Sequence, residues 1–69
     1  MYYEINVAKK SKEGYRHFFA TAKRSITLLF DLHKVYKVFK TVFPEPEYKI
    51  DITKWEETGH GIDPKSLIQ

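Results

Sequence analysis

The spacing of apolar and polar residues changes along the chain, and each spacing predicts a different element. Residues 2–8 alternate at every second position, with apolar side chains at the odd numbers, which is the pattern of a half-buried β-strand. The polar segment 9–14 ends in glycine and predicts a turn. The aromatic-rich segment 15–22 is then expected to be the returning strand of a hairpin.

The facing of this second strand depends on two adjacent phenylalanines. Neighbouring side chains of a regular strand point to opposite faces, so Phe18 and Phe19 are not expected to be buried together. We expect Phe18, Ala20 and Ala22 to point inward, because small alanines let a helix approach the sheet closely. A slip of one residue would reverse every assignment. The side chains expected to point outward are Tyr15, His17 and Phe19.

Residues 28–43 have the period of an α-helix, which ends before Pro44. Apolar residues recur there at steps of three and four, and this places them on one face. The expected buried stripe is Leu28, Leu32, Val35, Phe39 and Val42, widened by Tyr36 and Phe43. Ser25 or Thr27 is the expected N-cap, since either hydroxyl can accept a hydrogen bond from a backbone N–H. If Phe39 is in the core, Phe39→Ala should cost about 3–5 kcal/mol.

Residues 48–55 alternate again and predict a third strand with its even-numbered side chains inward. A right-handed crossover carries this strand to the free edge of the first. The predicted fold class is therefore α+β, a three-stranded antiparallel sheet in the order 2-1-3 with one main helix packed on one face (ββαβ). The domain is expected to span residues 1–58. Residues 59–69 are expected to form a C-terminal tail, either frayed or with a short helical turn ending at Leu67 and Ile68.

Composition narrows the classes of function. The 69 residues suffice for one domain and include no cysteine, which excludes disulfides and thiolate chemistry and favours a reducing compartment. No apolar run approaches the roughly 20 residues of a membrane span, and the N-terminus does not resemble a signal peptide, so we expect a cytoplasmic protein. The histidines have no metal-ligand spacing, and no nucleophile or phosphate-loop motif is present. We therefore expect no enzyme activity, no cofactor, no metal and no small-molecule substrate.

The net charge of +3 is unevenly distributed. Residues 1–24 carry a net +4, whereas residues 44–69 carry a net −3. A basic early segment can attract a polyanion, and the opposite charges of the two halves can also let two copies meet head to tail. The side chains that would contact phosphates are Lys9, Lys10, Lys12, Arg16 and Lys49.

One face of the predicted sheet has no expected cover. It would display aromatic side chains that commonly anchor interfaces, namely Tyr2, Tyr15, His17, Phe19 and Trp55. Three interpretations stay open: the tail folds back over this face, a second copy or a partner protein buries it, or nucleic-acid bases stack on it. We expect a non-enzymatic interaction module that forms a homodimer or binds a protein partner. The alternative is a small nucleic-acid-binding accessory protein that uses the same face and the basic hairpin.

The segments YYEINV, HFFATAKRSIT, VFP and YKIDITKWEETG, within residues 2–59, resemble short bacterial proteins from gut anaerobes and their mobile elements. That resemblance implies a sheet-plus-helix domain, with a role as an accessory protein of a mobile element, and brings no activity with it. A looser resemblance to the N-terminal part of HicB-type antitoxins rests on the aromatic-rich hairpin. The strand count and the connection to the helix differ there, so it implies nothing about individual residues.

Overall fold

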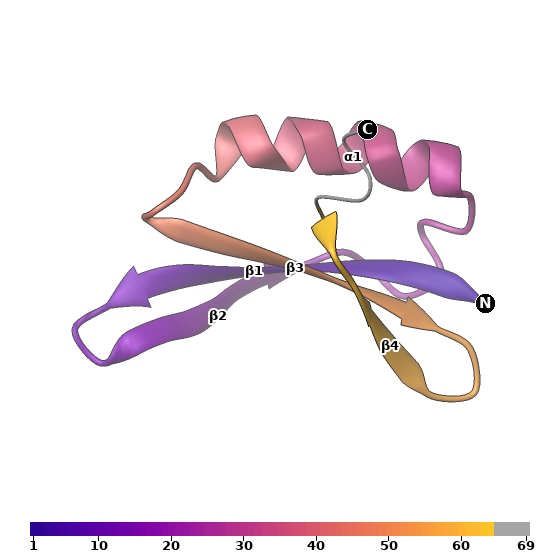
Figure 1. Cartoon of the computed structure of the whole chain (residues 1–69), viewed down its shortest axis with the longest axis horizontal. Helices are drawn as coiled ribbons and strands as arrows, with labels where there is room; N and C mark the ends of the chain where they lie inside the picture. The colour runs from indigo at the N-terminus through magenta and orange to yellow at the C-terminus, as the bar shows by residue number, and fades with distance from the viewer. Residues whose placement is uncertain (65–69) are drawn as a thin grey trace.

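One helix lies along one face of a four-stranded antiparallel sheet whose order is β2-β1-β3-β4 (Figure 1). The computed structural model describes residues 1–64. Within this part of the chain no helix or strand covers the opposite face of the sheet. The elements are β1 (Tyr2–Ser11), β2 (Gly14–Ala20), α1 (Leu29–Val42), β3 (Tyr48–Trp55) and β4 (Gly59–Ile62).

The predicted α+β class and the strand order 2-1-3 are confirmed, but the count of three strands is wrong. A fourth strand, β4, follows β3 and pairs with it, with Ile62 opposite Ile52. The sequence GHGI has no alternation of apolar and polar residues, because glycine contributes no side chain to the pattern. The helical turn predicted to end at Leu67 and Ile68 lies outside the described residues.

The core lies between α1 and the sheet. Odd-numbered residues of β1 and even-numbered residues of β3 face the helix, as predicted. The buried cluster is Tyr3, Ile5, Ile26, Leu32, Tyr36 and Ile52, with Val35, Phe39, Ile50 and Ile62 packed around it. The ends of the predicted helical stripe are wrong, because Leu28 and Val42 are 60% and 58% exposed. α1 rests on the sheet through its central turns and, at its C-terminal end, through Phe39 and Phe43. Phe39 is partly rather than fully buried.

The connection from β2 to α1 stays attached to β1. The Ile5 N–H donates to Thr21 Oγ1 at 3.0 Å, and the Tyr3 N–H donates to the Ile26 carbonyl at 2.7 Å. The predicted N-caps are wrong: the cap residue is Leu28, which makes no side-chain cap hydrogen bond, and the Ser25 hydroxyl instead donates to the Ala22 carbonyl. The connection is therefore held against β1 as far as Ile26, two residues before the cap residue Leu28.

Candidate interaction surface

A β-bulge in β2 places two consecutive phenylalanines on the helix side of the sheet. Val7 pairs with Phe19 and Ala8 pairs with His17, so Phe18 is an extra residue between the two pairs. Paired residues of antiparallel strands share a face, so Phe19 lies with Val7 on the helix side. The outward facing predicted for Phe19 is wrong because the bulge breaks the strict alternation of a regular strand.

The same pairing also corrects the predicted facing of the two alanines. Ala20 pairs with Asn6, which lies on the face away from the helix, so the inward facing predicted for Ala20 is wrong. Ala22 follows the end of β2 and is exposed. The helix therefore meets aromatic rings, rather than small alanines, along β2.

The two phenylalanines enter an aromatic cluster that joins the sheet to the C-terminal end of α1. Phe18 packs edge-on against Phe43 and Tyr48, with ring centroids 5.9 and 5.5 Å apart. Phe19 contacts Phe39 at 5.8 Å and Phe43 at 6.5 Å. Edge-to-face and offset arrangements at these distances are favourable, so the rings hold one another in place.

This cluster is only half covered. Phe18 is 51% exposed and Phe19 is 45% exposed. Val38 and Val42 are 59% and 58% exposed and lie one turn apart on the flank of α1 beside Phe39. We call Phe18, Phe19, Val38 and Val42 the apolar edge patch, because the phenylalanines belong to the edge strand β2 and Phe19 contacts α1 at Phe39.

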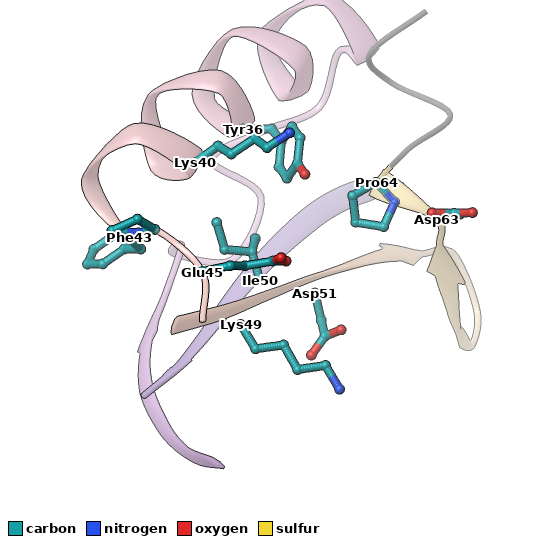
Figure 2. A pocket seen from close by; sticks show the side chains of 10 residues that line it. Tyr36, Lys40, Phe43, Glu45, Lys49, Ile50, Asp51, Asp63 and Pro64 are labelled. Atoms are coloured by element: carbon teal, nitrogen blue, oxygen red, sulfur yellow. The ribbon is translucent and has the colours of Figure 1, made fainter. Parts of the chain in front are cut away.

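The opposite flank of α1 faces β3 and the end of β4 across a pocket of about 440 Å³ (Figure 2). Lys40 and Tyr36 project toward it from the helix, and Asp63 and Pro64 close its far side. Burial raises the pKa of the Tyr36 phenol, and the negative charges of Glu45 and then Asp63 raise that pKa further. Since this flank faces β3 and β4, the valines of the apolar edge patch lie on the β2 side.

Two basic side chains, Lys9 and Arg16, lie on the same face of the sheet as the phenylalanines of the apolar edge patch. Residues 9–24 contain six lysine and arginine side chains and one acidic side chain, Glu13, for a net charge of +5. The Lys9 ammonium lies 5.9 Å from the ring centroids of Phe18 and Tyr48. Arg16 bonds to Glu13 at 3.1 Å, but both side chains are highly exposed and the pair holds them weakly. The patch therefore combines apolar contact area with positive charge.

The five predicted contact anchors do not form one surface. Tyr2 and Trp55 stack at one end of the open face, with ring centroids 6.5 Å apart. Tyr15 and His17 pair with Lys10 and Ala8 near the other end of β1. Side chains between these ends on the open face are mostly polar: Glu4, Asn6, Lys49, Asp51 and Thr53.

Two of these anchors also have structural contacts. Trp55 Nε1 donates to Glu4 Oε1 at 3.3 Å, and its ring lies against Gly59, where an added Cβ would come within 3.0 Å. The Tyr15 hydroxyl donates to the Pro46 carbonyl at 2.8 Å and so ties the hairpin to the loop before β3. These contacts within the molecule therefore account for the aromatic side chains of Trp55 and Tyr15 without a binding partner.

The predicted phosphate contacts are also divided between the faces. Lys9 and its pairing partner Arg16 lie on the helix side, whereas Lys49 lies on the open face. Lys12 is in the hairpin turn, where Gly14 adopts a φ of +116° that favours glycine. Val38 and Val42, which belong to the apolar edge patch, are not among the contact residues predicted from the sequence, and Phe18, predicted to point inward, is 51% exposed. The adjacent pair Phe18-Phe19 was the available signal.

Within residues 1–64 no three His, Asp or Glu side chains lie together as a metal site would require. No helix in this range combines the length and the apolar character needed to cross a bilayer, since α1 has 14 residues. No protein-family model, curated protein or solved structure matches the chain. The resemblance to short proteins of mobile elements therefore stays a prediction from sequence.

Proposed function

We propose that this chain is a non-enzymatic interaction module that binds another protein through the apolar edge patch. The observation that carries the proposal is the exposure of Phe18 and Phe19 on the edge strand β2, together with the exposure of Val38 and Val42 on α1. Small soluble domains seldom leave neighbouring large apolar side chains uncovered without a binding role. Aromatic anchors of this kind supply much of the binding free energy at protein interfaces.

The packing of the rings supports this role. Phe18 and Phe19 each touch two other aromatic rings, so they lose little conformational freedom when a partner covers them. By contrast, Tyr2 and Trp55 on the open face stack on each other, and polar residues separate them from the aromatic side chains at the other end. The proposed binding surface is therefore on the β2 side of the helix and not on the open face of the sheet.

Nucleic-acid binding remains the second candidate, and one specific observation favours it. The Lys9 ammonium lies next to the exposed Phe18 ring, within a segment that carries a net charge of +5. Bases stacked on Phe18 and Phe19 would bring their phosphates near these cations, as in proteins that bind single strands. Affinity for an oligonucleotide would then fall steeply as salt is raised.

Site-specific photo-crosslinking in the native host tests the proposal. The photoreactive residue p-benzoylphenylalanine replaces Phe18 in one variant and Tyr2 in a matched control, since both are aromatic and lie on opposite faces. We expect protein adducts from position 18 and none from position 2. Adducts from position 2 alone would return the contact surface to the open face. Adducts that nuclease removes would establish the nucleic-acid function instead, and no adduct at either position would contradict both.

A further inference from the structure

We propose that the free edge of β2 binds its partner by strand addition. The partner segment is extended and presents an acidic side chain and then an apolar side chain on the same face. This inference rests on the proposed function and specifies how the partner is held. Strand addition combines main-chain hydrogen bonds to an exposed sheet edge with side-chain contacts on alternate positions. Both kinds of contact are available along β2.

The edge of β2 is open along its length. Within residues 1–64 its one strand neighbour is β1, so its other side presents unpaired N–H and C=O groups. β2 has seven residues, whereas the opposite edge strand, β4, has four, two of which are glycines. β2 contains no proline, the residue that commonly blocks pairing at an edge.

The bulge divides this edge into two parts with different roles. Residues 14–17 pair with β1 without a shift of register and offer a short segment for main-chain hydrogen bonds. At Phe18 the extra residue bends the strand and interrupts the ladder. An added strand therefore gains a short run of hydrogen bonds on residues 14–17, and the apolar edge patch supplies the contact area beyond it.

Side chains on β2 determine the chemistry of the occupant. Arg16 lies on the helix side with the two phenylalanines, so one face of an added strand meets a cation and then exposed rings. The ion pair between Arg16 and Glu13 is 72% and 81% exposed at its two side chains, so an incoming carboxylate can replace Glu13 at little cost. An acidic residue opposite Arg16, followed by an apolar residue against Phe18 and Phe19, matches this order.

Charge argues against a second copy as the occupant. Pairing two β2 edges would bring together two segments that each carry a net charge of +5. Like charges within about 8 Å are only partly screened at physiological salt. An acidic segment of another protein instead gains from the same field, both in affinity and in rate of encounter.

Binding of a designed peptide tests this inference. The probe is a short fluorescein-labelled peptide that repeats Asp-Thr-Val-Thr, added to the full ¹⁵N-labelled chain. In an extended strand this repeat places aspartate and valine in turn on the same face, and we call it the aspartate–valine peptide. We expect binding by fluorescence anisotropy, and at saturation we expect amide exchange in β2 to slow by about tenfold while exchange in β4 is unchanged. A lysine–valine peptide and an aspartate–valine peptide with N-methylated backbone amides should each bind at least about tenfold more weakly.

A matched pair of charge reversals separates the local contact from net charge. Arg16→Glu and Lys49→Glu change the net charge equally, but Arg16 is on the β2 edge and Lys49 is on the open face. We expect Arg16→Glu to weaken binding of the aspartate–valine peptide about tenfold. Lys49→Glu should leave the affinity within about twofold of that of the unchanged chain. Equal losses would show nonspecific attraction and overturn the assigned site.

The outcomes also separate this inference from the proposed function. Protein adducts from position 18 combined with unchanged exchange in β2 at millimolar peptide would keep the interaction module and overturn strand addition. Slowed β2 exchange that appears without peptide, as the chain is concentrated and dimerises, would make a second copy the occupant and overturn the acidic partner. No adduct and no peptide binding would contradict both proposals.

Discussion

Replacing Leu32 by alanine tests which side of α1 is buried, and the proposed surface depends on that assignment. Leu32 is fully buried, with no exposed area, against Tyr3, Ile5 and Ile52. A Leu→Ala change at such a site costs about 2.7–5 kcal/mol, from lost transfer free energy and the cavity left behind. The whole domain is expected to have only about 3–10 kcal/mol, from roughly 0.05–0.15 kcal/mol per residue.

Urea unfolding followed by circular dichroism measures this cost. With a slope of about 1 kcal/mol/M for so small a protein, Leu32→Ala should lower the midpoint by about 3–5 M, or leave the chain unfolded without urea. The control is Val38→Ala on the same helix, where the side chain is 59% exposed. Alanine favours helix by about 0.5 kcal/mol over valine, so this midpoint should move by less than about 1 M. Similar losses for both variants would refute the orientation of α1 and, with it, the exposure of the apolar edge patch.

Other variants test local contacts by the same unfolding assay. The raised pKa of Tyr36 means that its contribution to stability is complete below its ordinary pKa of 10.0 and is lost as the pH rises through the folded-state pKa. Tyr36→Phe should therefore lessen the loss of stability above that pH, and an unchanged alkaline limb would contradict this. His33 Nε2 is buried and unpartnered within the described chain, so His33→Leu should raise stability by about 1 kcal/mol, and a lower midpoint would show that the ring is needed. Gly59→Ala places a Cβ 3.0 Å from ring carbons of Trp55, which should cost about 1 kcal/mol and shift the tryptophan fluorescence, whereas Gly61→Ala, which meets open space, should do neither.

Local sequence patterns predicted much of the fold correctly. The period of two in residues 2–8 and 48–55 identified which side chains of β1 and β3 face the helix. The period of three and four identified the central buried turns of α1, around Leu32 and Tyr36. These features are readable because the backbone geometry of a strand or helix fixes where successive side chains point. A helix with one apolar side must then pack on the sheet.

Pairing between segments that are far apart in the sequence determined the bulge in β2 and the fourth strand. The bulge at Phe18 depends on the register between β1 and β2, and a strand pattern read by itself cannot show an extra residue. β4 forms through backbone hydrogen bonds to β3, which its glycine-rich sequence does not encode as a pattern.

The exposure of Phe19, Val38 and Val42 was also settled by tertiary structure. An apolar side chain at the margin of a helix or strand is covered only if a neighbouring element extends that far. In this fold the buried side chains of α1 are Leu32 and Tyr36, and β2 has no strand beyond it within residues 1–64. The sequence by itself thus determined which elements form and which sides are apolar. Only the tertiary structure decided which apolar side chains stay uncovered, because that depends on where one element ends against another.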